Sequence, residues 1–287
     1  MSGTLVAEHR ALVSRAFPGL AIASFEPIGD GWTVFTYEVN GDTIVQLPRS
    51  AYAADRLRAQ MRLLPELARE LPAAVPVPTL VSEEPVVMGY RKLKGAPLGA
   101  ASDGVWPERL GRFLYDLHAV APEILGLRGM SAATVSDLFD ERLAVLRERV
   151  LPLLEPATAR RLGERMDAFL ADHATRRYAP CLTHGDIGPE HILVSPDGDL
   201  AGVLDWEELA IGDPAADLAW MLRARPADGE RVLAGYGGAP DPSFRARAAF
   251  RFVLMPFHDV VHGLTTGDDA LVEAGLAGIR DRDAPTA

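Results

Sequence analysis

Two aspartates and two histidines lie close together in the segment LTHGDIGPEHILVSPDGDLAGVLDW, residues 182–206: His184, Asp186, His191 and Asp205. Residues 191–195 and 200–206 are predicted strands around a turn, Pro-Asp-Gly-Asp. Asp186 precedes this hairpin and Asp205 closes it, so both carboxylates can face one cleft. Phosphoryl transfer needs one carboxylate at an acceptor hydroxyl and another that holds a divalent cation. The spacing therefore favours metal-dependent phosphoryl transfer.

Two other interpretations of these side chains stay open. Aspartates are common in solvent-exposed turns, and Asp186 and Asp205 are compatible with that ordinary role. His184, Asp186 and His191 could also form a hydrolytic metal site, although their spacing is loose and no further His/Asp motif accompanies them. For His184 we expect a structural role, in which its ring braces the loop through hydrogen bonds.

Three motifs in this part of the chain carry a resemblance to a known family. They are HGDIGPEH, LDW and GDPAADLA, in that order and with compatible spacing. The chain resembles the aminoglycoside and macrolide phosphotransferases, whose fold is similar to that of protein kinases. The catalytic loop of that family reads H-G-D-x-x-x-x-N, with His in the last place in some members.

The resemblance implies roles for the residues in these motifs. Asp186 would be the catalytic base, and His191 and Asp205 would lie at the metal, expected to be Mg²⁺ or Mn²⁺. The residues expected to support the catalytic loop are His184, Asp213 and Asp217. Asp213 is also predicted to be a helix N-cap, with Pro214 at the first helical position.

Earlier segments resemble the nucleotide-binding half of the same family. IGDGWTVFTYEV stands where the family has its nucleotide-covering loop, and MGYRKLKGAPL resembles the hinge that meets the base of ATP or GTP. The residues expected at the nucleotide are Gly29, Gly31, Gln46, Gly89, Tyr90 and Arg91.

The chain departs from the family pattern in two places. Gln46 and Gln60 stand where the family usually has a Lys or Arg that pairs with the phosphates and a Glu that positions it. Two amides leave no unpaired charge, but a neutral Gln stabilises phosphate charge poorly. We consider Arg49 or Arg91 as substitutes, or a register shifted by a residue or two. His191 is the second departure, since imidazole is a poor ligand for Mg²⁺ and a better one for Mn²⁺. We expect either that His191 touches the metal through water or that the enzyme works unusually well with Mn²⁺.

The elements around these motifs predict an α+β, protein-kinase-like fold with two lobes. Residues 1–94 form a small, strand-rich lobe for the nucleotide, with a helix at 4–17, a hairpin that turns at Asn40-Gly41, and a helix at 53–71 that Pro65 should kink or split. Residues 95–287 form a larger helical lobe with the catalytic hairpin and the acceptor site. We expect the end of the chain, residues 279–287, to fray.

Composition limits the remaining possibilities. The chain has 287 residues, 48% of them apolar, and a net charge of −11. That charge argues against nucleic-acid binding, and the single cysteine excludes an internal disulfide. No apolar run is long enough to cross a bilayer. We expect a cytoplasmic monomer or simple dimer without nucleic-acid or membrane partners. Candidate acceptor-binding residues, which are equally compatible with solvated surface positions, are Glu207, Glu208, Asp259 and His262.

These observations predict an enzyme that moves the γ-phosphoryl of ATP or GTP to a hydroxyl of a small molecule. The resemblance implies an antibiotic acceptor, an aminoglycoside or a macrolide. The same fold also serves metabolic kinases that act on choline, homoserine or sugar-like compounds, since fold does not fix the substrate. A third alternative is a degenerate nucleotide-binding protein, in which Gln46 and Gln60 mark lost catalysis.

Overall fold

The computed structural model describes residues 3–29, 31–99 and 103–283. Contacts group the chain into two compact units. Unit 1 comprises Met1–Arg109, Ile124–Gly126 and Gly188–Leu209, and unit 2 comprises Leu110–Glu123, Leu127–Ile187 and Ala210–Ala287. The lobes expected from the sequence divide at residues 94 and 95 and stay a prediction. The contact units divide the chain elsewhere because the catalytic hairpin packs with unit 1.

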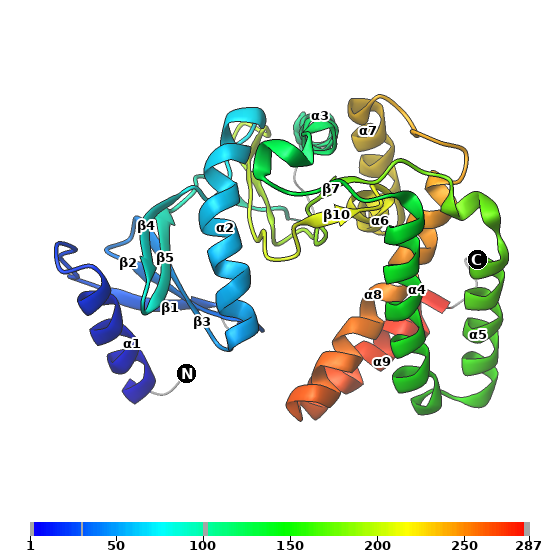
Figure 1. The fold of residues 1–287 in the computed structure, drawn as a ribbon, viewed down its shortest axis with the longest axis horizontal. Coiled ribbons are helices and arrows are strands. Elements are labelled where there is room, and N and C mark those ends of the chain that lie inside the picture. The colour runs from blue at the N-terminus through cyan, green and yellow to red at the C-terminus, as the bar shows by residue number, and fades with distance from the viewer. Residues whose placement is uncertain (1–2, 30, 100–102, 284–287) are drawn as a thin grey trace. The chain divides into compact units, whose positions relative to one another are not determined.

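Unit 1 is built on a five-stranded antiparallel sheet with one helix on each face (Figure 1). The strands run in the order β1-β2-β3-β5-β4. α1 packs on one face through Val13, and α2 packs on the other through Leu57 and Met61. The elements are α1 (Gly3–Ala16), β1 (Phe25–Gly29), β2 (Val34–Val39), β3 (Thr43–Pro48), α2 (Ala51–Glu70), β4 (Pro78–Glu83) and β5 (Val86–Arg91).

The turn between β2 and β3 lies where the sequence predicts it. Asn40 and Gly41 both have positive φ, 55° and 80°. Asn and Gly tolerate this left-handed backbone better than other residues do, which is why the pair is typical of tight hairpins. The predicted hairpin is confirmed.

The helix α2 differs from the expectation at Pro65. It runs unbroken from Ala51 to Glu70 with Pro65 inside it. Leu64 and Leu67, on either side of the proline, are fully buried. Packing of this apolar face outweighs the hydrogen bond that proline removes, so the expected split is wrong.

The catalytic hairpin belongs to a small second sheet of unit 1, in the order β6-β8-β9. It consists of β6 (Ala96–Pro97), β8 (Ile192–Val194) and β9 (Leu200–Val203). The return strand is shorter than expected, because it ends at Val203 instead of residue 206. Beyond it, Asp205 adopts a left-handed backbone with φ of 62°, which cannot continue a strand.

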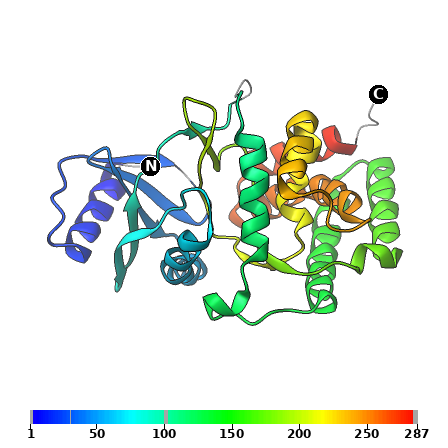
Figure 2. The same ribbon diagram turned by 90° about the horizontal axis from the view of Figure 1, so that it is seen from above.

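Unit 2 is mainly helical, with one short pair of strands. β7 (Cys181–Thr183) pairs antiparallel with β10 (Ala210–Gly212). α3 (Trp106–Ala119) begins in unit 1 and continues into unit 2, and it buries Leu110, Phe113, Leu114 and Leu117. The further helices, seen from a second direction in Figure 2, are α4 (Ala132–Val150), α5 (Pro156–Ala171), α6 (Ala215–Ala224), α7 (Pro226–Tyr236), α8 (Phe244–Thr266) and α9 (Asp269–Asp283), with three short 3₁₀ turns at Pro122–Leu125, Leu151–Leu153 and His173–Arg176.

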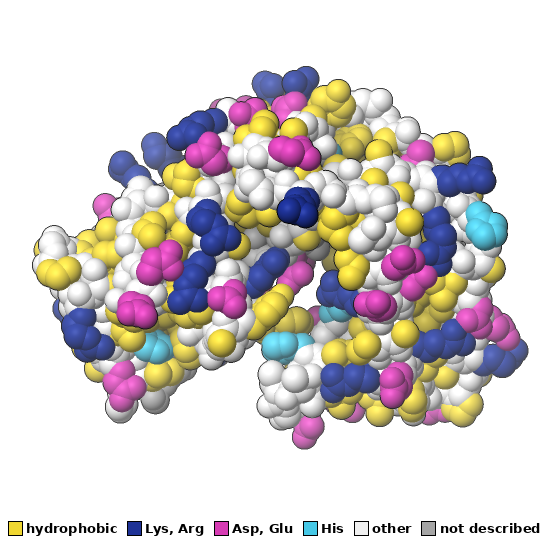
Figure 3. Space-filling view, viewed as in Figure 1, with side chains coloured by type: hydrophobic (Ala, Val, Ile, Leu, Met, Phe, Trp, Pro, Cys, Tyr) yellow, Lys and Arg dark blue, Asp and Glu magenta, His cyan; other side chains and the backbone are white. Residues whose placement is uncertain are grey.

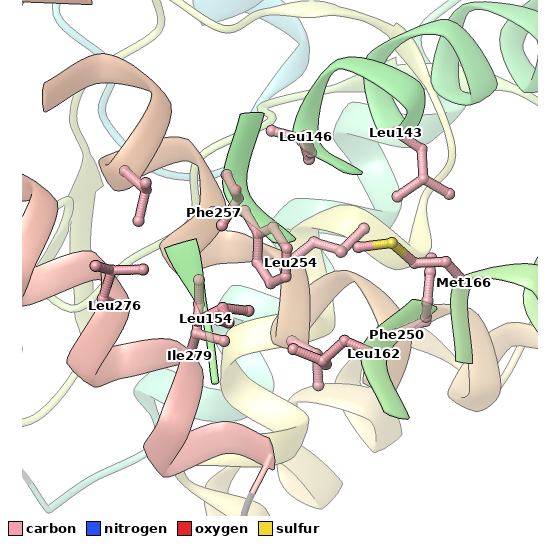
Figure 4. Close-up of a cluster of buried hydrophobic side chains, with 13 residues drawn as sticks. Leu143, Leu146, Leu154, Leu162, Met166, Phe250, Leu254, Phe257, Leu276 and Ile279 are labelled. Carbon is pink, nitrogen blue, oxygen red and sulfur yellow. The ribbon is translucent and has the colours of Figure 1, made fainter. Parts of the chain in front are cut away.

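The core of unit 2 joins helices from distant parts of the sequence. Figure 4 shows Leu143 and Leu146 of α4, Met166 of α5 and Phe257 of α8 directed toward one another. Ile279 of α9 is fully buried in the same cluster. The expected fraying is therefore wrong for residues 279–283, while residues 284–287 lie outside the described part of the chain.

The surface of each unit mixes charges of both signs. On the face drawn in Figure 3, Lys and Arg side chains alternate with Asp and Glu. Within residues 3–29, 31–99 and 103–283, no helix has the length and apolar character that a bilayer crossing requires.

Candidate active site

The loop that carries Asp186 is positioned by the strand pair of unit 2. The loop starts directly after β7, and β10 runs beside β7 with Gly212 opposite Cys181. The chain then passes from β10 into α6. The pairing therefore brings the first turn of α6 next to the start of the loop.

Asp217, in that first turn, holds the backbone of the loop. Its two carboxylate oxygens accept hydrogen bonds from the backbone N–H groups of His184 and Gly185, each at 2.8 Å. The ring Nδ1 of His184 accepts a hydrogen bond from the N–H of Asp186 at 3.3 Å. Asp217 and His184 are fully buried, whereas Asp186 is exposed. The carboxylate of Asp186 is thus exposed, while the backbone directly before it is held by the buried carboxylate of Asp217.

His118 is a functional candidate that the sequence analysis missed. Its Nε2 lies 3.0 Å from a carboxylate oxygen of Asp217, and its Nδ1 lies 2.8 Å from the hydroxyl of Tyr236. Burial acts to raise the pKa of Asp217, but the hydrogen bond and charge of His118, the charge of His184 and the N–H of Gly185 together hold that pKa below its ordinary value. The available signal was a histidine one helical turn after Leu114, on the apolar face of α3.

Asp213 links the start of α6 to α8. One of its oxygens accepts from the N–H of Ala215 at 3.0 Å, while the other accepts from Nε of Arg247 and of Arg251, both at 3.0 Å. The N-cap of α6 is Pro214 and the helix begins at Ala215, so the predicted N-cap at Asp213 is wrong by one residue. The Asp213 side chain still accepts from the N–H of the first helical residue. Nothing in the sequence near Asp213 indicated its two arginine partners.

Asp205 and His191 lie together at the end of the hairpin in unit 1. The N–H of Leu204 donates to the carbonyl of His191 at 2.8 Å, which extends the ladder of the hairpin beyond β9. The Nε2 of His191 is 3.6 Å from a carboxylate oxygen of Asp205. The Asp205 side chain is 42% exposed, so it is accessible to a ligand.

These two side chains have the chemistry of a metal site that is completed by substrate. Among the described residues, no group of three or more His, Cys, Asp or Glu side chains could hold a metal ion alone. Mg²⁺ in phosphotransfer sites is usually bound by one or two carboxylates together with substrate phosphates and water. One carboxylate with an adjacent imidazole fits a cation that arrives with a nucleotide.

Glu207 connects this segment to the glycine-containing loop. The hydroxyl of Thr33 donates a hydrogen bond to its carboxylate. Thr33 follows Gly31, one of the two glycines expected at the nucleotide. Gly29 is the last residue of β1, beside a break in the β1–β2 register. The side chain of Glu207 is thus engaged inside unit 1, while Glu208 is half-buried nearby in sequence.

Gln46 and Gln60 both belong to the interface between the sheet and α2. Ile44 of β3 packs with Leu57 and Met61 of α2, and alternation along the strand places Gln46 on the same face. Gln60 is buried, one turn beyond Leu57 on α2. The neutral pair stands where the resemblance implies an ion pair.

The expected hinge residues have different environments. A Cβ on Gly89 would lie 3.0 Å from the side chain of Leu80, so glycine permits close packing of β5 on β4. The Tyr90 side chain is buried on the α2 face of the sheet. Burial and the charge of Asp205 raise the pKa of its phenol, so the hydroxyl stays protonated. Arg91 is exposed at the end of β5.

Arg49, considered above as a substitute for the missing cation, contacts residues of β2. Its guanidinium stacks 3.8 Å from the ring centroid of Phe35 and donates to the carbonyl of Val34 at 3.4 Å. Phe35 packs against His9 and the α1 face of the sheet. These contacts place the guanidinium of Arg49 on the α1 face of the sheet, opposite the face that carries Gln46. A role as a substitute for the missing cation stays a prediction.

The acceptor candidates on α8 form a separate group in unit 2. Burial raises the pKa of Asp259, against the charges of Arg282 and His262, which act to lower it. Arg282 also donates to the carbonyl of Phe252 at 2.5 Å. That Asp259 and His262 bind the acceptor substrate stays a prediction.

The comparison with known families agrees with this geometry. A family described as "Phosphotransferase enzyme family" matches residues 24–252, most of the chain. The chain belongs to this family. The motif-based resemblance is therefore confirmed.

Individual relatives of this phosphotransferase cover almost its whole length. Viomycin phosphotransferase of Streptomyces vinaceus is 27% identical over 296 residues, which span 96% of this chain and 99% of that protein. The apoenzyme of macrolide 2′-phosphotransferase MphH from Brachybacterium faecium is 29% identical with a TM-score of 0.74, covering 100% and 99%. The GDP complex of aminoglycoside 2′-phosphotransferase-IIIa has 24% identity and a TM-score of 0.84, covering 97% and 98%, which shows the shared fold.

These matches confirm the predicted fold class and enzyme class. The fold is α+β and kinase-like, with an antiparallel sheet in one unit and helices in the other. The protein belongs to a family of phosphotransferases.

Proposed function

We propose that this phosphotransferase phosphorylates a hydroxyl group of an antibiotic, with Asp186 as the catalytic base. The observation that carries the assignment of the base is the support of its loop. Asp217 fixes two backbone N–H groups directly before Asp186, and the Asp186 carboxylate itself is exposed. A base on a rigid backbone can hold a hydroxyl within the narrow range of geometry that transfer requires.

In the proposed reaction, Asp186 accepts the proton of the acceptor hydroxyl. The oxygen forms a bond to the γ-phosphorus while the bond from that phosphorus to the β–γ bridging oxygen breaks. The bridging oxygen leaves with the nucleoside diphosphate, and the acceptor becomes a phosphate ester. The attack is in line, so positioning accounts for much of the acceleration.

His191 and Asp205 are the proposed residues on the metal side. Mg²⁺ or Mn²⁺ held there would neutralise the charge that develops on the transferred phosphoryl group. The Asp205 carboxylate would hold the cation, and His191, 3.6 Å away, would bind it directly or through water. Gly29 and the segment from Gly31 to Thr33 would cover the phosphates, and the backbone around Tyr90 and Arg91 would meet the base.

The proposed acceptor class follows from the relatives. The full-length match to viomycin phosphotransferase and the matches to macrolide and aminoglycoside enzymes support an antibiotic hydroxyl. The net charge of −11 suits an acceptor that carries amino groups. Related structures hold GDP or ADP, so both ATP and GTP are candidate donors. We place the enzyme in the cytoplasm, where both donors occur, as a monomer or simple dimer.

A phosphoryl-transfer screen tests this proposal. Purified protein is incubated with ATP or GTP, with Mg²⁺ or Mn²⁺, and with viomycin, kanamycin, a macrolide, choline, homoserine or a sugar, and product mass is measured. We expect a product that gains one phosphoryl group with one antibiotic. Asp186→Asn should lower its rate by at least about 10³-fold, because the hydroxyl loses its base.

Asp197→Asn is the matched control, since Asp197 is an exposed acid in the turn of the same hairpin. It should leave turnover within about two-fold of wild type. Product formed with choline, homoserine or a sugar alone would replace the antibiotic by a metabolic acceptor. Nucleotide binding without transfer to any acceptor would favour a degenerate binder, with Gln46 and Gln60 as the cause.

A further inference from the structure

Gln46 of β3 is neutral at the position where the family usually has a Lys or Arg that pairs with the phosphates. Gln46 and Gln60 leave the interface between β3 and α2 neutral, yet a nucleoside triphosphate carries about four negative charges, of which one divalent cation offsets only two. A kinase that retains transfer therefore needs a positive group from another position. The inference that follows rests on the proposed function and concerns unit 1 alone.

Arg56 lies on α2 one helical turn before Gln60. Residues four apart on a helix share a face, so Arg56 and Gln60 point the same way from α2. Arg56 is half-buried, and its Nη2 donates to the backbone carbonyl of Leu209 at 3.4 Å. This bond is long and goes to a neutral acceptor, so it is a weak one. A guanidinium has five N–H donors, which leaves Arg56 ample capacity for a ligand.

The carbonyl that Arg56 reaches belongs to the segment that carries the metal-side carboxylate. Leu209 follows Asp205 by four residues, and Glu207 between them accepts the hydrogen bond from Thr33 of the glycine-containing loop. Arg56 from α2 and Thr33 from the loop therefore contact the same short segment. A triphosphate held by Asp205 through a cation and covered by that loop would lie beside this segment.

Three other cationic side chains of unit 1 make contacts with other partners. Arg58, two residues after Arg56, makes 3.0 Å ion pairs with Asp55 and with Glu83 of β4. Lys92 pairs with Glu38 of β2. Arg49 stacks on Phe35 on the α1 face. The hydrogen bond of Arg56 to the Leu209 carbonyl leads toward the segment after Asp205.

We propose that Arg56 binds the phosphates of the nucleoside triphosphate, in place of a cation at position 46. On nucleotide binding, the guanidinium exchanges its long bond to the Leu209 carbonyl for charge-assisted hydrogen bonds to phosphate oxygens. Such bonds are roughly twice as strong as neutral ones, and the planar fork of arginine matches a phosphate. The positive charge has moved from the strand to the helix, one turn from Gln60.

Calorimetric titration of Arg56→Gln with MgATP or MgGTP and with the corresponding nucleoside tests the proposal without any acceptor. We expect the triphosphate to bind about 10- to 100-fold more weakly, since one charge-assisted contact is lost, and nucleoside affinity to stay within two-fold. Arg58→Gln is the matched control and should leave both affinities near wild type. Equal weakening of triphosphate and nucleoside, or equal effects of the two substitutions, would overturn the proposal.

Two further variants separate charge from packing. Arg56→Lys keeps the charge and should lose less affinity than Arg56→Gln. The double variant Q46K/R56Q returns a cation to the strand and should recover at least a part of the lost triphosphate affinity. If neither variant binds the triphosphate better than Arg56→Gln does, the loss of affinity comes from altered packing of α2 and not from the missing charge, and the proposal is wrong. Wild-type protein that binds no triphosphate would instead refute the proposed function.

Discussion

The loop of Asp186 and the turn of Asp205 are supported in opposite ways. Below Asp186, Asp217 is fully buried and accepts hydrogen bonds from two backbone N–H groups and from His118. The Asp205 side chain is 42% exposed, its backbone has a positive φ of 62°, and the Nε2 of His191 lies 3.6 Å from its carboxylate. The loop of the proposed base is held by a buried, hydrogen-bonded carboxylate, whereas the proposed metal-side carboxylate is itself partly exposed.

This difference matches the two tasks that we propose. A general base must meet one hydroxyl in one geometry, so fixed support is an advantage. A carboxylate that binds a cation together with a nucleotide receives most of its order from the ligand. A strained residue such as Asp205 persists where function selects it against local stability. We therefore expect substitutions below the loop to change stability, and substitutions in the turn to change metal use.

The largest expected effect is at Asp217. Asp217→Ala leaves the N–H groups of His184 and Gly185 and the ring of His118 without their acceptor in a buried site. We expect the free energy of unfolding to fall by about 3–5 kcal/mol, measured by urea denaturation. Asp205→Ala should change it by less than about 1 kcal/mol, because its carboxylate is largely solvated. Similar losses of unfolding free energy in Asp217→Ala and Asp205→Ala would show that the two side chains support the fold equally, against our expectation.

The pH dependence of Asp217 sharpens the same contrast. Its native pKa lies below the ordinary value of about 3.9, so the unfolded state takes up a proton before the native state does. The stabilisation of the folded state by the ionised Asp217 is therefore complete above the ordinary pKa of about 3.9. It is lost as the pH falls through the native pKa. The gap in unfolding free energy between wild type and Asp217→Asn should be constant near neutral pH and narrow below about pH 4. A gap that widens on acidification would contradict the sign of the shift.

A smaller effect is expected at His118, which has a natural counterpart in unit 1. His118 binds both Asp217 and the hydroxyl of Tyr236, while His9 binds the hydroxyl of Tyr37 at 2.6 Å. His118→Phe should cost about 1.5–3 kcal/mol in unfolding free energy, because it also removes a bond to a carboxylate. It should also lower turnover by relaxing the loop. His9→Phe should cost less and leave turnover unchanged, and equal turnover losses would show that His118 does not act through Asp217.

Much of the fold and of the site's chemistry could be predicted from local signals. The Asn40-Gly41 turn specifies its hairpin through its own backbone preference, and HGDIGPEH and LDW mark the loop and the turn because their residues are consecutive. The motifs also fixed the family. Such features depend on residues that are neighbours in sequence, which is why a single chain reveals them.

The missing parts depend on packing between distant elements. No local pattern shows that His118 of α3 binds Asp217 of α6, or that Arg247 and Arg251 of α8 bind Asp213. Burial likewise overrode local rules elsewhere. The helix α2 continues through its proline because its apolar face is packed, and the chain end stays helical to Asp283 because α9 joins the core.

The backbone at Asp205 provides a test of strain in the turn. Glycine adopts φ of 62° without the steric penalty that a side chain pays. Asp205→Gly should therefore keep or raise the unfolding free energy, by up to about 1 kcal/mol, while it abolishes metal-dependent turnover. Thermal unfolding in the presence of EDTA measures the first effect. A clear loss of stability would mean that the Asp205 side chain supports the fold, and the turn would then resemble the loop.

The smallest expected effect is at His191 and concerns the choice of metal. Imidazole suits Mn²⁺ better than Mg²⁺, whereas the amide oxygen of asparagine suits both hard cations. His191→Asn should lower the ratio of activity with Mn²⁺ to activity with Mg²⁺ by a few-fold, a change of about 1 kcal/mol. The readout is the ratio of the two activities, so that a change in stability common to both metals does not affect it. An unchanged ratio would place His191 outside the metal site, and the carboxylate of Asp205 would then have to hold the cation without help from the hairpin's first strand.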